Sequence, residues 1–258
     1  MNDAALTLQQ VRYEQRSFWR NPVSAFFAFL FPIIFLVVFA TLFKNTNAEV
    51  ARGVTVKYDD YYIPALTTFG VIGACFTNIA SSLSLRRDSG ILKRLRGTPL
   101  PSAVFMLGVV GSSLIVSVLL TGFTIVFGIL VYGVHVPSHI GPLVATLAVG
   151  AMSFCALGLA MTVVIPNAEA APAIVNAVLL PLVFISGTFF PVSSTSVLST
   201  IANYFPVHHF ITAMFTAFDP GHQSATGWAG NDLLIIAAWG VGGLIVAVRR
   251  FRWEPHRT

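Results

Sequence analysis

The sequence predicts an all-α integral membrane protein with six transmembrane helices, and its composition and charge distribution are the observations that predict it. Of the 258 residues, 55% are hydrophobic and only 10% are charged, whereas a soluble domain carries roughly 25% charged residues. So few charges cannot cover a water-facing surface, and the mean hydropathy of +0.79 agrees with this. These values exclude a soluble enzyme, a disordered chain and a collagen-like fibre.

Six predominantly apolar stretches are each long enough to cross a hydrocarbon core of about 30 Å as a helix. Helices are required there because lipid offers no hydrogen-bond partner to an open backbone group. The predicted spans cover residues 25–43, 61–85, 104–132, 140–165, 173–192 and 232–248. Together they predict a single transmembrane domain over residues 1–258.

The positions of lysine and arginine predict the orientation of these spans. The N-terminal segment, the loop over residues 86–101 and the C-terminal tail carry twelve of the fifteen Lys and Arg residues, and the loop over residues 44–60 carries the other three. Loops rich in Lys and Arg stay in the cytoplasm. The chain is therefore expected in the plasma membrane with both termini cytoplasmic, which six spans satisfy.

Two further segments lie outside the spans. Residues 4–19 mix apolar and basic side chains, which favours an amphipathic helix on the inner membrane surface; the alternative is a solvated lead-in. Residues 197–218 lack charged residues and are interrupted by Pro206. They are too broken for two more spans, so we expect a pair of short helices dipping into the outer leaflet between the fifth and sixth spans.

Residues that carry catalysis or ion coupling are scarce. The spans contain almost no ionisable residue, although a buried carboxylate is typical of proton- or sodium-coupled carriers. No G-x-x-x-x-G-K-[ST] phosphate-binding loop occurs. We therefore expect no enzyme activity, no cofactor and no metal site in this chain. Cys75 and Cys155 are expected to pack as small apolar side chains, and His208 and His209 to lie at a wet outer interface.

The loop over residues 86–101 has the most informative pattern. Ile91, Leu92 and Leu95 form a short apolar face surrounded by basic residues, and Gly97 is placed to end this helix. Such a helix, lying parallel to the membrane, suits docking onto a soluble partner. The alternative is a basic cluster that sets topology and contacts anionic lipid.

This loop, RRDSGILKRLRGTPL from Arg86 to Leu100, resembles the intracellular loop of the ABC-2 type transporter permeases. FISGTFFP, from Phe184 to Pro191, resembles the family's F-x-S-G-x-x-F-P signature after the fifth span. YFPVHH, beginning at Tyr204, resembles the stretch that follows, with Phe205 where Asn is common. The two motifs occur in the right order, and the resemblance covers essentially the whole chain.

The resemblance implies an ABC exporter subunit of bacterial type. Such permeases pair as homo- or heterodimers in the membrane and bind cytoplasmic ABC ATPase subunits, here on a separate chain that holds ATP and Mg; no nucleic acid is implied. The implied coupling helix, which contacts the ATPase, comprises Ser89, Gly90, Ile91, Leu92, Lys93, Arg94, Leu95 and Arg96. Glu169 is the implied second inner contact, and the implied outer gate comprises Gly187, Phe189, Phe190 and Pro191.

The implied substrate path runs along the second and fifth spans. Its expected lining is neutral and polar or aromatic: Thr67, Thr68, Thr77, Asn78, Ser81, Ser82, Asn176, Phe184, Ser186 and Thr188. A lining without fixed charge suits a hydrophobic or amphipathic solute, so drug or lipid efflux, including antibiotic resistance, is the first interpretation. The alternatives are glycan export, a membrane scaffold that recruits a cytoplasmic partner, and ordinary interhelical hydrogen bonds between these residues.

Overall fold

The structure is a computed structural model that describes residues 3–43, 47–50, 54–134, 136–189, 197–220 and 224–251. In chain order the elements are α1 (Asp3–Trp19), α2 (Pro22–Leu42), β1 (Asn47–Val50), β2 (Val54–Lys57), α3 (Tyr58–Ile72), the π-helical turn η1 (Gly73–Thr77), α4 (Asn78–Asp88), α5 (Ile91–Arg96), α6 (Ser102–Tyr132), α7 (Ile140–Met161), α8 (Ala171–Ile185), α9 (Val197–Ala202), α10 (Pro206–Phe218) and α11 (Gly230–Arg250).

Within the described residues, four helices are long and apolar enough to cross a membrane: Asp60–Asp88, Ser102–Tyr132, Ile140–Met161 and Gly230–Arg250. Two shorter apolar helices, Ala28–Leu42 and Ala171–Ile185, lie where the sequence predicts the first and fifth spans. The predicted all-α membrane fold is therefore confirmed.

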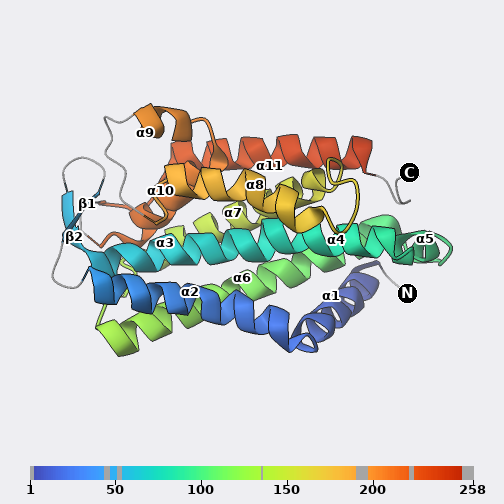
Figure 1. The fold of residues 1–258 in the computed structure, drawn as a ribbon, viewed down its shortest axis with the longest axis horizontal. Helices are drawn as coiled ribbons and strands as arrows, with labels where there is room; N and C mark the ends of the chain where they lie inside the picture. The colour runs from blue at the N-terminus through green and yellow to red at the C-terminus, as the bar shows by residue number, and fades with distance from the viewer. Residues whose placement is uncertain are drawn as a thin grey trace.

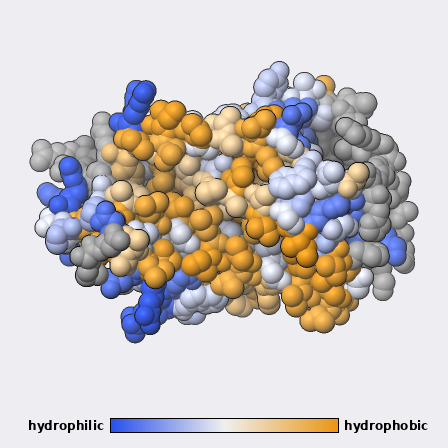
Figure 2. All heavy atoms as spheres, turned by 180° about the vertical axis from the view of Figure 1, so that it is seen from behind, coloured by the Kyte–Doolittle hydropathy of each residue, from blue (hydrophilic) through white to orange (hydrophobic). Residues whose placement is uncertain are grey.

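The helices form an elongated bundle in which α3 and α4 run through the middle (Figure 1). The start of α1, all of α5 and the end of α11 lie at one end of the bundle, and the β1–β2 hairpin and α9 lie at the other (Figure 1). Seen from behind, hydrophobic residues form a broad band over the middle of the molecule, and hydrophilic residues gather toward the two ends (Figure 2). A band of this kind is what a bilayer core requires of the surface that faces it.

The N-terminal helix α1 packs against α6 and so does more than lie on a membrane surface. The Gln15 side-chain amide donates a hydrogen bond of 2.8 Å to the backbone oxygen of Ser112 on α6. An aromatic contact joins α1 to α2, since the Trp19 ring stacks on Phe29 with the ring centres 5.6 Å apart. The predicted amphipathic helix is present, and its inner face is part of the bundle.

The β1–β2 hairpin was not expected from the sequence, which predicts only a loop in this region. The two strands pair antiparallel, with Asn47 opposite Lys57 and Val50 opposite Val54. Each strand has four residues, which is too short for an alternating pattern to stand out beside the long apolar stretches.

The second predicted span is one helical stretch in which α3 passes through η1 into α4. A π-helical turn contains one extra residue, so a neighbouring helix that packs closely here has to fit against the bulge. Gly158 on α7 provides that fit. A Cβ atom at this glycine would lie 2.8 Å from the Phe76 backbone oxygen and 3.1 Å from that of Cys75. The Cys75 sulfur also lies 3.1 Å from the Ser117 hydroxyl oxygen on α6, so η1 is held from two sides. Both cysteines are free and buried.

We predict that Gly158→Ala destabilises the protein by about 1–3 kcal/mol, because the new methyl group meets backbone atoms that cannot rotate away. The control is Gly242→Ala on α11, where an added Cβ meets nothing within 4 Å; there alanine should be neutral or stabilising. Unfolding of the purified protein by SDS titration measures both. Equal midpoints for the two variants would contradict close packing of α7 on η1.

Candidate functional site

The short helix α5 carries most of the residues that the sequence predicts as a contact for a partner ATPase. It starts after Gly90, whose φ of 72° is the left-handed conformation that glycine adopts without strain. Leu92 is fully buried, and Leu95 is partly buried against the core. Ile91, with 44% of its surface exposed, is the one apolar residue of α5 that faces outward.

This burial corrects the expectation that Ile91, Leu92 and Leu95 together form a docking face. The apolar side of α5 points mainly into its own subunit, because the leucines of this six-residue helix at the end of the bundle are buried against the nearest part of the hydrophobic core. The side chains of Ser89, Lys93, Arg94 and Arg96 are exposed. A partner that meets α5 therefore meets basic and hydroxyl groups around a single isoleucine.

Immediately before α5, Arg87 is buried with only 2% of its surface exposed. Its guanidinium donates hydrogen bonds to the backbone oxygens of Thr162 at 2.9 Å, Ile165 at 2.6 Å and Pro166 at 3.3 Å. These carbonyls belong to the turn that ends α7, where helical partners run out. Arg87 thus joins the end of α4 to the end of α7 with charge-assisted bonds, which are stronger than neutral ones.

The next residue, Asp88, reaches the segment between the α7 turn and α8. Its carboxylate accepts a hydrogen bond of 2.5 Å from the backbone N–H of Ala168. Glu169, the expected second inner contact, follows directly and its side chain is exposed. The structure therefore brings the two inner segments together, and they meet through Arg87 and Asp88.

Arg86 connects the end of α4 to α1. Its two terminal nitrogens donate to the two Glu14 carboxylate oxygens at 2.7 and 2.6 Å, a bidentate ion pair. Glu14 is 6% exposed, and it also accepts a hydrogen bond from the Gln10 amide at 2.9 Å. Sequence reasoning missed this pair because its members are far apart in the chain. The available signal was Glu14 itself, an acid within a segment whose other charged side chains near it are arginines.

Residues 86–88 therefore form a junction, hereafter the inner junction, that fixes α4 to α1, to the end of α7 and to the segment before α8. Sequence analysis took these charges as topological signals and as part of a docking loop. In the structure, Arg86, Arg87 and Asp88 each make a hydrogen bond within the subunit. The inner junction therefore fixes the position of α5 and of its exposed side chains.

At the opposite end, the segment after α8 packs under α3. The Tyr61 hydroxyl donates to the backbone oxygen of Gly187, and the Tyr62 hydroxyl donates to that of Phe189 at 3.3 Å. The Phe189 ring lies in an aromatic cluster, with centroid distances of 5.0 Å to Phe184, 5.4 Å to Phe69 and 5.6 Å to Phe35. Gly187 and Phe189, two of the expected gate residues, are thus buried contacts; Phe190 and Pro191 lie outside the described residues.

The sequence predicts a wet interface for both histidines, and this prediction is wrong for His209. It is 7% exposed, its Nδ1 lies 2.6 Å from a carboxylate oxygen of Asp232, and its Nε2 lies 2.8 Å from the backbone oxygen of Asn203. Since a backbone oxygen only accepts, Nε2 donates to it. His209 thereby links the segment after α9, the start of α10 and the start of α11.

His208, its neighbour, is half-buried, and burial lowers the pKa of this imidazole below its ordinary value. In the part of the chain that the structure describes, no group of three or more His, Cys, Asp or Glu residues is placed to hold a metal ion.

The expected substrate-path residues divide into two groups. Thr67, Thr68, Ser186 and Thr188 are buried inside the subunit. Asn78, Asn176 and Phe184 are exposed on α4 and α8, and Thr77 lies between the two groups at half-burial. Asn78 also lines a polar cavity of about 440 Å³ between α1, α4 and α6, together with Ser81 and Ser82.

The family model of the ABC-2 type transporter matches residues 6–218. The chain belongs to the ABC-2 type transporter family. As an ABC-2 protein it is the membrane component of a transporter, and the resemblance seen in the loop after the second span is confirmed. No curated protein matches the chain.

We predict that Arg87→Met in this ABC-2 permease lowers the free energy of unfolding by about 2–4 kcal/mol, because buried carbonyls of the α7 end lose their donor. Arg96→Met, which removes the same charge from an exposed position of α5, should change stability by less than about 0.5 kcal/mol. SDS titration measures both, and a mild Arg87 variant would show that the carbonyls have other donors.

Proposed function

We propose that the chain is the permease subunit of an ATP-driven exporter that moves a hydrophobic or amphipathic solute, drug-like or lipid-like, out of the cytoplasm. In this proposal a separate ABC ATPase chain binds ATP and Mg and hydrolyses the nucleotide. Two permease copies, identical or different, form the membrane pore in a bacterial plasma membrane, with both termini in the cytoplasm.

The observation that carries the proposal is the inner junction. A push on a flexible loop is lost as loop motion, whereas α5 is anchored by Leu92 and preceded by three residues that are each bonded to another element. A displacement of α5 by a partner therefore moves the ends of α4 and α7 and helix α1 together. This is the mechanical property that energy coupling between two chains requires.

The rest of the bundle offers a route for this displacement to the outer end. α4 continues through η1 into α3, and α3 carries the tyrosines that hold Gly187 and Phe189. Because helices transmit axial displacement far better than loops do, motion of residues 86–88 is expected to reach the segment after α8. Glu169, next to the bonded Ala168, supplies a second surface for the ATPase.

The nature of the exposed polar residues supports an amphipathic solute. Asn78 on α4 and Asn176 and Phe184 on α8 offer neutral hydrogen-bonding groups and an aromatic face to a neighbour outside the subunit. We assign the path to these residues, since the buried threonines Thr67 and Thr68 face the subunit interior. A free phosphate or metal ion would find no fixed charge along them.

The proposed function first predicts the orientation of the chain in the membrane. Single cysteines replace Lys93 on α5 or Lys57 on β2, both exposed, in a background without Cys75 and Cys155. A membrane-impermeant thiol reagent on intact cells should label position 57 and leave position 93 unlabelled, because twelve of the fifteen Lys and Arg residues lie in the segments that are predicted to be cytoplasmic. Permeabilised cells should label at both positions. Labelling of 93 alone in intact cells would invert the topology.

The second prediction concerns the partner contact. Arg94→Glu/Arg96→Glu reverses two exposed charges on α5 and should lower retention of the co-expressed ATPase several-fold in a salt-dependent way, since each exposed pair contributes about 0–1 kcal/mol. Arg249→Glu/Arg250→Glu makes the same charge change at the end of α11 and should retain the ATPase normally. A pull-down and an efflux assay provide the readouts.

Full retention and full efflux in the α5 variant would remove α5 from the interface. The wild type could also retain the ATPase and export none of the candidate drugs and lipids. That result would favour the scaffold interpretation over a transporter.

A further inference from the structure

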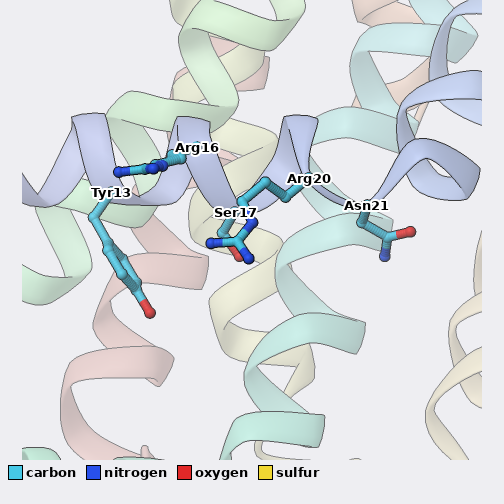
Figure 3. A pocket seen from close by; sticks show the side chains of 5 residues that line it. All are labelled: Tyr13, Arg16, Ser17, Arg20 and Asn21. Atoms are coloured by element: carbon cyan, nitrogen blue, oxygen red, sulfur yellow. The ribbon is translucent and has the colours of Figure 1, made fainter.

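A small pocket of about 180 Å³ lies on α1 near the turn into α2, on the side away from the α1–α6 contact. Its lining consists of Tyr13, Arg16, Ser17, Arg20 and Asn21. The spacing of three and four residues places the first four on one face of the helix. Figure 3 shows Tyr13, Ser17 and Arg20 extending to the same side of α1, with Arg16 running along the helix.

The charge of this face is uncompensated. No carboxylate among the described residues pairs with Arg16 or Arg20, and like charges four residues apart on a helix repel each other. Glu14, the acid on the adjacent face, is neutralised by its bidentate pair with Arg86. An anion bound on this face would neutralise the two guanidinium groups.

The pocket adjoins the 440 Å³ cavity between α1, α4 and α6, because Ser17 and Asn21 line both. The cavity offers hydrogen-bonding groups without net charge. The side chains of Asn78, Ser81 and Ser113 line it, and among the described residues no hydrogen bond is made to these three side chains. A ligand with an anionic group and neighbouring hydroxyl or amide groups matches the two parts.

Apolar side chains flank the same turn. Trp19 and Phe26 are 51% and 54% exposed, one at the end of α1 and the other on the first turns of α2. Tryptophan at this position is typical of a membrane–water interface. A ligand that neutralises the arginines and also covers these exposed rings has to carry an apolar chain as well as a negative charge.

We propose that α1, with α4 and α6, binds the head group of an anionic phospholipid of the inner leaflet. Arg16 and Arg20 contact the phosphate, the polar cavity receives the remainder of the head group, and Trp19 and Phe26 contact the acyl chains. The site begins beside the Glu14–Arg86 pair, since Tyr13 and Arg16 flank Glu14 on α1 and the pair lines the adjoining cavity, so the bound lipid holds α1 against the inner junction. The inference goes beyond the proposed function and does not depend on an ATPase.

The test compares purified protein in nanodiscs of phosphatidylcholine alone and in nanodiscs with one phosphatidylglycerol in four lipids. Phosphatidylglycerol should raise the melting temperature of the wild type. Arg16→Gln/Arg20→Gln should lose this rise and bind phosphatidylglycerol about thirtyfold more weakly, because two arginines that each contribute about one kcal/mol at an anionic surface are removed. Arg249→Gln/Arg250→Gln removes the same charge from another helix end and should keep the rise.

Three outcomes overturn the proposal. The first is an equal loss of the lipid effect in both double variants, which indicates a diffuse electrostatic effect. The second is a rise produced equally by inorganic phosphate in phosphatidylcholine nanodiscs, which indicates a free-anion site. The third is a normal rise in Arg16→Gln/Arg20→Gln. The melting temperature in phosphatidylcholine alone reports whether each variant is folded, and Arg16→Lys/Arg20→Lys, which keeps the charge, should restore lipid binding.

Discussion

The end of a helix inside a membrane protein must find donors for its last carbonyl groups, and this requirement organises the inner end of the bundle. α7 ends in a turn whose carbonyls accept hydrogen bonds from the buried guanidinium of Arg87. A buried charge is stable only when it is fully bonded. Because Arg87 is committed in this way, its neighbours Arg86 and Asp88 are held in fixed directions, toward Glu14 and Ala168 respectively. The position of α5 follows from these three contacts.

Sequence reasoning was most successful where a single physical property decides the outcome. Apolar length places the membrane helices, and the glycines on both sides of ILKRLR place α5. It failed where the outcome depends on what lies across the bundle. Leu92 has the spacing of a docking residue, but only the tertiary structure decides whether its side chain meets a partner or its own core. The η1 turn has no signature in hydrophobic periodicity, and its fit depends on Gly158 of a different helix. His209 was expected at a wet interface, and its pairing with Asp232 is decided only by the side-by-side starts of α10 and α11.

The two ends of the molecule are built on different principles. The inner end is fixed by charge: ion pairs and a guanidinium on carbonyls, with further basic residues left exposed on α5. The end that carries the β1–β2 hairpin is held mainly by aromatic rings and by tyrosine hydroxyl groups on backbone oxygens, with Phe39 stacked on Tyr62 at 4.9 Å, and the buried contact of His209 with the Asp232 carboxylate adds to them. Charge-assisted bonds are directional and resist rotation, whereas ring contacts allow sliding at modest cost. This division suits the proposed transport cycle, in which the end with α5 receives force from an ATPase and the other end rearranges.

The π-helical turn in the second span also sets a phase. One residue of an α-helix corresponds to about 100° of rotation, so the extra residue in Gly73–Thr77 turns every side chain of Asn78–Asp88 by that angle relative to α3. With a regular helix, Arg86 and Arg87 would be rotated by about 100° from the directions in which they contact Glu14 and the α7 turn. The bulge therefore sets a fixed angle between α3, which contacts the segment after α8, and α4, which carries the contacts of the inner junction. Removal of one residue within it would leave the span long enough to cross the bilayer and yet aim its two halves at the wrong neighbours.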